Sequence, residues 1–511
     1  MLASRSFLFV LLVIVGVSFA AIQLDTSNSA RQNAADDYGH IVSLLPVGVV
    51  SPSSVQEVVE IVNYANSNGI EIAAVGAAHS TKGTAQALNG IVVNMTNLNQ
   101  VLSVGSDSAW VEAGATWRSL VEATLPLGLT PPVFTDYIKL SIGGTLAVGG
   151  VGSQTPNHGI QLDNVEALEV VTGKGKIVEC SPTKKSKLFY AVLGGLGQFG
   201  IVTKAKISLI PAKQNVRYVK LLYSDYTQFA DDLFVMANGD TYEGVQGFAI
   251  ENTATAVAIF SGNAFPDQDF PLNDDDDDNT DDYWVYMIEG TAYFNDASEA
   301  KPLSELTQGL QPINVDFTDI SYFAYLTRLD PVEAIQIQFG SWFLPHPKID
   351  VIVGRAASYD FIPSELAMNT VADVNGVILI CPYLASTINV PNFPLPEEDE
   401  VLLFALLRAA VPSTETEIDR LLALNTAMYD RTLAVGGVGY AIDSVPLNPE
   451  SWEVHFGADR YAELLKQKKK YDRNNIFAPT QNVFHDSDIQ GGSSSTSTST
   501  STSTSSSSSE Q

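Results

Sequence analysis

The glycine cluster GGLGQFG constrains the fold more than any other segment of the chain. Gly195, Gly197 and Gly200 have the G-x-G-x-x-G spacing of dinucleotide-binding folds, in which the glycines follow a strand and open a helix. Here the preceding residues 186–195 have a helical pattern, and the following residues 201–210 alternate like a strand. The order of elements is reversed, which argues against a nicotinamide-binding fold of this type.

The segment AAVGAAHSTKG (residues 73–83) places His79, one of six histidines, among the smallest side chains. A second glycine cluster, SIGGTLAVGGVG (residues 141–152), also lets the backbone approach another molecule closely. Either cluster alone can be a pair of tight turns, and a buried histidine can be satisfied by backbone groups. Two glycine clusters and His79 in one region together favour a flat cofactor.

Hydrophobic periodicity predicts mixed α and β structure along the chain. Ser54 and Glu57 can form a capping box for a helix over residues 55–68, with Gly69 as its stop. A further helix is predicted over residues 119–128. Strands are predicted at residues 70–75, 90–95, 110–115, 165–172, 176–180, 201–210, 216–224, 245–252 and 283–294.

Charge and the N-terminal residues limit the class of protein. The net charge of −30 over 511 residues argues against a nucleic-acid partner, because phosphate groups would be repelled. Residues 1–20 read as a secretory signal peptide, with Arg5, an apolar stretch and a small-x-small cleavage site. No later segment has about 20 consecutive apolar residues, so no membrane span is expected and a secreted protein is predicted.

Four further features carry weaker expectations. Cys180 and Cys381 are expected to be two buried thiols with one optional bridge. Asn94 lies in a glycosylation sequon. The acidic run at residues 273–282 lacks the glycine and distal glutamate of a calcium loop, so a solvated loop and no metal site are expected. The Ser/Thr-rich tail, residues 488–511, is expected to be disordered.

Three segments together resemble cytokinin dehydrogenases. They are FTDYIKLSIGGTLAVGGVG (residues 134–152), the stretch from NVEALEVV to ISLIPA (residues 164–212) and KKYDRNNIFAPTQNVF (residues 469–484). Cytokinin dehydrogenases are secreted flavoproteins of the vanillyl-alcohol oxidase superfamily, with a PCMH-type FAD-binding fold. The likeness extends from residue 41 to residue 484.

The resemblance implies an α+β fold with two domains. It assigns an FAD-binding domain to residues 40–215 and a return segment to residues 441–487. A substrate domain over residues 216–440 is expected to contain an antiparallel sheet covered by helices.

The resemblance also implies FAD joined covalently to His79, because this histidine stands where the family reads G-R-G-H-S. Ala77 and Ala78 replace the family's Arg and Gly, and Thr84 replaces a usual Gln. The cofactor-binding residues that the resemblance implies are Gly76, His79, Ser80, Thr135, Asp136, Gly143, Gly144, Gly197, Ile201 and Gln481.

Two carboxylates match catalytic positions of the family, Asp136 in FTDYIKL and Glu289 in YMIEGTAYF. Oxidation of an allylic secondary amine sends a hydride to the flavin while the nitrogen loses a proton, which a nearby carboxylate can accept. Asp136 could instead be an ordinary turn or cap residue, and Glu289 could face solvent.

The substrate pocket departs from the family pattern. The family reads HPWLN where this sequence reads HPKID, so Lys348 and Asp350 are the expected substrate-binding residues, beside Asp136 and Glu289. Replacing Trp by Lys348 removes an aromatic wall and adds a cation, which brings charged substrates into consideration. A tyrosine of the family is matched only by Tyr440, slightly out of register.

The leading hypothesis is therefore a secreted FAD-dependent enzyme that cleaves N6-isopentenyladenine-type amines. Its partners would be a small-molecule amine and an electron acceptor, either a quinone or oxygen, and it would be a monomer. A second hypothesis keeps the flavin and changes the substrate to sugars, aldonolactones or alcohols. A third is a secreted surface protein without catalysis.

Overall fold

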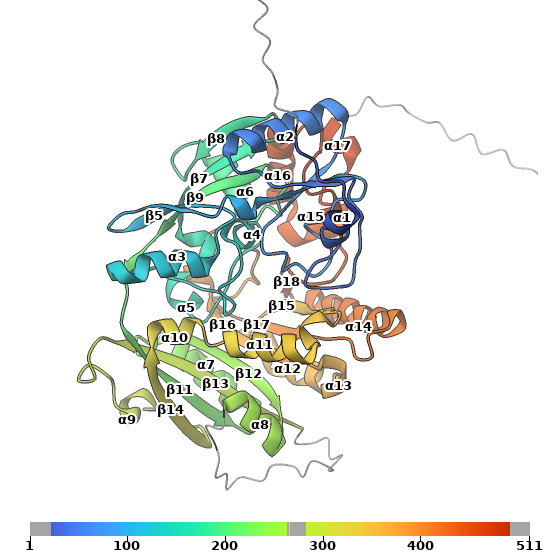
Figure 1. The fold of residues 1–511 in the computed structure, drawn as a ribbon. Helices are drawn as coiled ribbons and strands as arrows, with labels where there is room; N and C mark the ends of the chain where they lie inside the picture. The colour runs from blue at the N-terminus through green and yellow to red at the C-terminus, as the bar shows by residue number, and fades with distance from the viewer. Residues whose placement is uncertain (1–21, 263–264, 266–282, 491–511) are drawn as a thin grey trace, which may run out of the picture.

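The computed structural model describes residues 22–262, 265 and 283–490 (Figure 1). The predicted signal peptide and the acidic run lie outside the described residues, as does the tail from residue 491. The expected start of the tail at residue 488 is wrong, because residues 488–490 belong to the short helix α17 (Asp486–Gln490). That helix ends the described part of the protein.

The helix predicted over residues 55–68 is confirmed as α2 (Val55–Asn68). The Ser54 side chain accepts a hydrogen bond from the Glu57 backbone N–H, and Gly69 ends the helix at φ 62°. The predicted capping box forms only in part, because the Glu57 carboxylate accepts from the N–H and hydroxyl of Ser53 rather than from Ser54. The buried side of α2 packs on a small parallel sheet in the order β1 (Gly48–Val50), β3 (Ile91–Asn94) and β2 (Ile72–Val75).

A five-stranded antiparallel sheet follows and forms the upper layer in Figure 1. Its strand order is β4 (Val101–Val104), β5 (Ser108–Glu112), β9 (Ile201–Ser208), β7 (Val165–Thr172) and β8 (Lys176–Cys180). Helices of this half are α1 (Asn28–Asn33), α3 (Trp117–Thr124), α4 (Ile142–Leu146), α5 (Thr155–His158) and α6 (Ser186–Val192). The glycine cluster lies between α6 and β9, so the predicted helix–glycine–strand order is confirmed.

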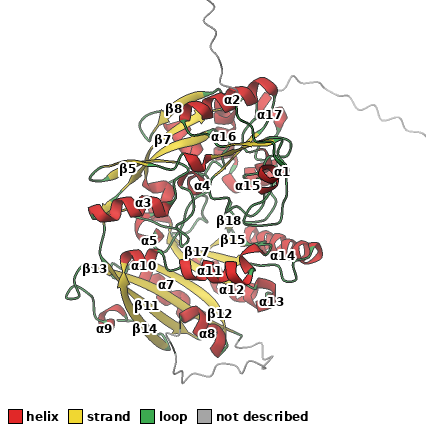
Figure 2. Cartoon of the chain, in the orientation of Figure 1, coloured by secondary structure: helices red, strands yellow, loops and turns green. Residues whose placement is uncertain are grey.

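An eight-stranded antiparallel sheet forms the lower layer, coloured yellow in Figure 2. Its strand order is β14 (Asn314–Ser321), β11 (Asn215–Tyr223), β13 (Trp284–Phe294), β12 (Gly244–Glu251), β16 (Val377–Leu384), β17 (Glu400–Leu407), β15 (Ile349–Gly354) and β18 (Val438–Gly439). Apolar side chains of α7 (Tyr226–Asn238), α12 (Arg355–Met368) and α14 (Glu415–Ala434) cover one face. The smaller helices of this half are α8 (Ala254–Ser261), α9 (Leu303–Leu306), α10 (Tyr322–Leu326), α11 (Asp330–Phe339) and α13 (Val371–Val374).

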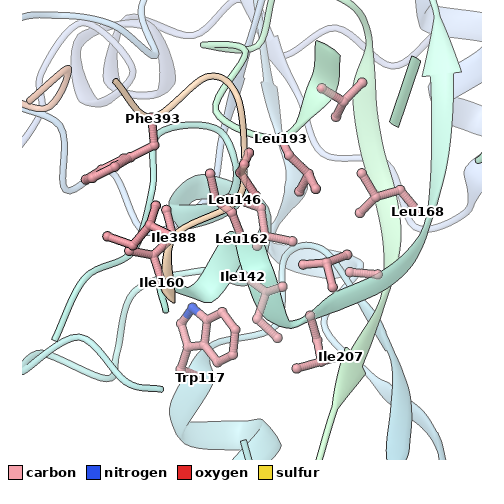
Figure 3. Close-up of a cluster of buried hydrophobic side chains, with 14 of the residues drawn as sticks. Trp117, Ile142, Leu146, Ile160, Leu162, Leu168, Leu193, Ile207, Ile388 and Phe393 are labelled. Carbon is pink, nitrogen blue, oxygen red and sulfur yellow. The ribbon is translucent and has the colours of Figure 1, made fainter. Parts of the chain in front are cut away.

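The two halves share one apolar core, part of which Figure 3 shows. Trp117 and Ile142 from the first half lie in the same cluster as Ile388 and Phe393, which follow β16 in the second half. Tyr218 from the eight-stranded sheet also belongs to it. Because large buried apolar surfaces drive association, this core holds the two halves together.

The cysteine expectation is confirmed for the thiols. Cys180 and Cys381 are both buried and free, so the optional bridge is not formed. Asn94 ends β3, and its side chain accepts from the N–H and hydroxyl of Thr96.

The C-terminal segment returns to the first half, where its red ribbon lies beside the blue N-terminal helices in Figure 1. It contains α15 (Pro449–Phe456) and α16 (Ala458–Tyr471). The N–H of Ile72 donates to the carbonyl of Ile476 at 2.6 Å, and the N–H of Ala478 donates back to the carbonyl of Ile72 at 3.0 Å. Residues 476–478 therefore add to the edge formed by β2.

A fully buried ion pair fixes this return. The Lys468 ammonium donates to Asp472 Oδ2 at 2.8 Å, to Gln198 Oε1 at 2.8 Å and to the carbonyl of Gln198 at 3.0 Å. Asp472 also accepts from the N–H groups of Ile476 and Phe477 at 3.1 Å. Burial lowers the pKa of Lys468, and Asp472 opposes this shift. The pair joins α16, the glycine cluster and the C-terminal segment.

Replacing Lys468 with Met should lower the free energy of unfolding by about 3–5 kcal/mol, because it leaves the Asp472 carboxylate buried without its cation. Urea titration of the full-length protein measures this as a lower unfolding midpoint. The control is Lys466→Met, since the Lys466 side chain is 72% exposed and should change stability by less than about 0.5 kcal/mol. Equal midpoints for the two variants would contradict the role of the buried pair.

Candidate cofactor and active site

A cavity of about 410 Å³ lies where the two halves meet. Its walls come from the loop after β2, from α4 and its flanking loops, from the glycine cluster before β9 and from the C-terminal return. The predicted site residues that line it are Gly76, His79, Ser80, Thr135, Gly143, Gly144, Gly197, Ile201, Lys348 and Gln481. Sequence elements more than 400 positions apart therefore meet around one space.

The loop after β2 brings mostly small residues to the cavity wall, together with the side chains of His79 and Lys82. A Cβ atom on Gly76 would lie 2.1 Å from Ser141 Oγ and 2.6 Å from Ser141 Cβ, so only glycine fits there. Within the described part of the protein, the backbone N–H groups of Ala78, His79 and Ser80 have no hydrogen-bond partner. Adjacent unpaired N–H groups make a site for an anion such as a pyrophosphate.

The buried carboxylate of Asp37 supports this loop from behind. Its Oδ2 accepts from the Ser80 hydroxyl at 2.9 Å and from the Gly83 N–H at 2.8 Å. Its Oδ1 accepts from the Gly39 N–H at 3.1 Å. Burial raises the pKa of Asp37 and these hydrogen bonds oppose the rise. Sequence reasoning did not find Asp37, because its partners in the loop lie more than 40 positions away.

His79 lies in an aromatic cluster formed with Tyr38, Tyr137, Trp342 and His346. Its ring stacks on Tyr38 at 4.0 Å and on Tyr137 at 5.0 Å, and Trp342 lies 5.9 Å away. Burial, reinforced by Lys348 and His346, lowers the pKa of His79 to about 3. The imidazole is therefore neutral at neutral pH and keeps a free electron pair on one ring nitrogen.

Trp342 lies near the HPKID segment and belongs to the aromatic cluster around His79. The presence of Lys348 in that segment predicts a site without an aromatic wall. Trp342 provides an indole beside His79 and Tyr137 from a position just before the segment. Trp342 is not itself among the residues that line the cavity, whereas Lys348 is, so a cavity wall without the family's indole at this position stays a prediction.

Two lysine side chains line the cavity, and each lies close to a buried carboxylate. Lys348 Nζ lies 3.6 Å from Asp350 Oδ2, which is an ion pair without a hydrogen bond. Lys82 Nζ lies 3.5 Å from Asp443 Oδ1 and 3.2 Å from the carbonyl of Val445. Burial raises the pKa of Asp443 to about 6, against the opposing effect of Lys82. Neither carboxylate lines the cavity, so Asp350 is placed behind Lys348 rather than at the wall.

The two predicted catalytic carboxylates lie outside the cavity lining. Asp136 sits between Thr135 and Tyr137, which both line the cavity, and its carboxylate accepts from the guanidinium of Arg328. Glu289, on β13, is 7% exposed and accepts from Gln246 Nε2 at 2.8 Å. The solvent-facing alternative for Glu289 is therefore wrong.

Tyr440 and Gln481 bring the C-terminal return into the site. The Tyr440 hydroxyl accepts from the Gly150 N–H at 3.0 Å, so this tyrosine reaches the cavity although it is out of register with the family. Among the described residues, the buried Oε1 of Gln481 has no hydrogen-bond partner. A polar side-chain atom left free beside a cavity fits a ligand with hydrogen-bonding edges, as a flavin has.

Neither a membrane-spanning helix nor a metal-binding cluster is found among the described residues. No helix in residues 22–262 or 283–490 is long and apolar enough to cross a membrane. The same part of the protein has no group of three or more His, Cys, Asp or Glu residues that could hold a metal ion.

Comparison with known proteins adds two family matches. Residues 46–181 match the model of an FAD binding domain, and residues 213–484 match the model described as "Cytokinin dehydrogenase 1, FAD and cytokinin binding". The second model alone covers more than half of the sequence. The glycine loop, the unpaired N–H groups and the free amide oxygen of Gln481 fit the FAD that these models name.

Individual relatives agree over most of the sequence. Cytokinin dehydrogenase 9 of Oryza sativa subsp. japonica is 34% identical over 467 residues, covering 88% of each protein. Cytokinin dehydrogenase 1 of Arabidopsis thaliana is 32% identical over 472 residues, covering 88% of this protein and 81% of its own length. An uncharacterized oxidoreductase of the fasciation locus of Rhodococcoides fascians is 32% identical over 451 residues, covering 88% and 95%. The chain belongs to the cytokinin dehydrogenase family of FAD-dependent oxidoreductases.

Proposed function

We propose that this enzyme oxidises the C–N bond that joins the side chain of N6-isopentenyladenine-type amines to the purine. The observation that carries the proposal is the position of Asp136. Its sequence neighbours Thr135 and Tyr137 both line the cavity, and Tyr137 stacks on His79 at 5.0 Å, so Asp136 belongs to a loop beside the proposed cofactor site. A proton acceptor beside a flavin is what amine oxidation requires.

The residues on the cavity wall would hold FAD, which accepts a hydride from the substrate when it is bound. The N–H groups of Ala78, His79 and Ser80 would bind its pyrophosphate. The neutral His79 has a free electron pair for a covalent bond to the flavin, and we propose that this bond forms. Thr135, Gly143, Gly144, Gly197, Ile201 and Gln481 would contact the rest of the cofactor.

Asp136 would accept the proton that leaves the amine nitrogen as the C=N bond forms. Water then adds to the imine, and the C–N bond breaks to give adenine and an aldehyde. The two electrons removed from the substrate pass on to a quinone or to oxygen. Glu289, whose carboxylate Gln246 holds in place, would assist Asp136 from β13.

The N-terminal pattern supports a further proposal, that the protein is secreted after removal of residues 1–20. The domain boundaries at residues 215 and 440 also stay predictions. Their support is that β11, the first strand of the eight-stranded sheet along the sequence, starts at Asn215 and that β18 ends at Gly439.

A second candidate function keeps the flavin and changes the substrate. Lys348 places a cation on the cavity wall where the resemblance implies an indole. An ammonium group favours substrates with an anionic or strongly polar part, such as sugar acids or lactones. One fold can support several reactions, so the fold does not choose between the amine and the sugar acid or lactone as substrate. Measuring which of these substrates reduces the flavin distinguishes the two candidate functions.

Gly76→Ala should sharply reduce the amount of bound flavin, because the added Cβ would overlap Ser141 and displace the loop. Flavin absorbance per mole of purified protein measures this. The double variant Gly76→Ala, Ser141→Gly removes the overlapping atoms and should recover flavin binding. Gly239→Ala is the control, since its Cβ would meet no atom closer than 3.3 Å. A fully loaded Gly76→Ala protein would contradict the proposed loop.

Asp136→Asn should slow flavin reduction by N6-isopentenyladenine by about 100-fold or more, because an amide cannot accept the proton. Anaerobic stopped-flow bleaching of the flavin measures the rate, and adenine should appear as product. Asp319→Asn is the matched control, since Asp319 also pairs with an arginine but lies at the edge of the eight-stranded sheet.

Unchanged bleaching in Asp136→Asn would refute the role of this carboxylate. If the wild-type flavin bleaches with a sugar acid or lactone and not with the amine, the second candidate function replaces the first.

A further inference from the structure

Arg328 occupies a protected position beside the candidate catalytic loop. It lies in the turn between α10 and α11 and is 15% exposed. One guanidinium nitrogen donates to Asp136 Oδ1, and the other donates to the carbonyl of Tyr325 at 3.3 Å. The guanidinium also lies over the Tyr325 ring at 4.4 Å. These contacts fix the arginine on three sides.

The surroundings of Arg328 are acidic and phenolic. Burial opposes its charge, but Tyr325, Asp136, Tyr218 and Glu289 raise the pKa of Arg328 well above its usual value. Glu289, on β13, is also an electrostatic neighbour of Tyr218 on the adjacent strand β11. Of the two carboxylates proposed for catalysis, Asp136 forms an ion pair with this guanidinium, and Glu289 acts on it only through its charge.

The start of α11 contacts the same loop through further polar pairs. The Tyr137 hydroxyl donates to Glu333 Oε1 at 2.9 Å, and Lys139 pairs with both Glu333 and Asp330. The helix α11 that makes these contacts has no buried residue. Its contacts with the loop that carries Asp136 are thus made by charge and hydrogen bonding.

We infer that Arg328 is a positioning residue that fixes the Asp136 carboxylate between the cavity-lining residues Thr135 and Tyr137. The inference rests on the proposed function in one respect, that Asp136 accepts the amine proton. Without the guanidinium, the Asp136 carboxylate loses the hydrogen-bond donor that fixes its rotamer. An ion pair that only joined the two halves of the protein would instead lower the stability of the fold without a specific effect on kcat.

The test compares Arg328→Met and Arg328→Lys in the flavin-loaded full-length protein, with N6-isopentenyladenine as substrate. The Met variant should lose about 100-fold in kcat with little change in KM, and the Lys variant, which keeps the charge, should retain more activity. Flavin content and the urea midpoint are measured on the same samples. Arg217→Met is the matched control, because Arg217 also pairs with a carboxylate and lies over the Phe317 ring at 4.6 Å.

A double-mutant cycle separates this inference from the proposed function. If Arg328 acts through Asp136, adding Arg328→Met to Asp136→Asn should cause no further loss in kcat. If the double variant loses a further factor of about 100 in kcat relative to Asp136→Asn, the inference is overturned. It is also overturned if the lower kcat of Arg328→Met is fully explained by lower flavin content or a lower urea midpoint. If Asp136→Asn alone keeps full activity, the proposed role of Asp136 fails. If Arg328→Met still loses activity in that case, Arg328 does not act through Asp136, and the inference fails as well.

Discussion

The buried ion pair of Lys468 and Asp472 is the constraint on which the cavity depends. A charge without water must have partners, and Lys468 finds them in three separate segments: the glycine cluster, its own helix and the strand-like C-terminal return. The same segments are joined by a further hydrogen bond, which Gln198 Nε2 donates to the carbonyl of Ala478 at 3.0 Å. Residues nearly 300 positions apart are thereby fixed as walls of one site.

The other side of the cavity is organised differently. There the first half meets the eight-stranded sheet through the shared apolar core and through charged contacts at the start of α11. The apolar core resists separation, while the ion pairs at the start of α11, whose side chains are 15–34% exposed, fix the loop that carries Asp136. The aromatic cluster around His79 includes Tyr137, which bonds to α11. The rigid wall would bind the cofactor, and the charged loop would carry the reacting carboxylate.

Much of the fold could be predicted from local patterns. The helix at residues 55–68, the reversed order around the glycine cluster and the long alternating strands all formed as expected, because period and turn chemistry are local signals. The resemblance to the family also selected residues that line the cavity, including His79 and Gln481. The predicted capping box formed only in part, because the Glu57 carboxylate accepts a hydrogen bond from the N–H of Ser53 instead of Ser54. The spacing of the two residues does not distinguish these partners.

The contacts that tune the site could not be predicted from the sequence alone. Arg328 reaches Asp136 across 192 positions, and Tyr38 stacks on His79 from a segment with no motif of its own. Trp342 joins the aromatic cluster around His79 from a position that carries no motif. The place of Asp350 in HPKID predicts a pocket residue, yet it backs Lys348 from within the protein. Such relations depend on how strands and loops meet, not on their spacing.

The most direct test of the central claim is the state of the flavin in the purified wild-type protein. We predict a single flavin per protein molecule that stays attached after the protein is denatured and digested, on the peptide that contains His79. Flavin absorbance and mass spectrometry of that peptide measure both properties. A folded protein that is colourless would contradict the assignment of the cavity, and a flavin released on denaturation would contradict the bond to His79.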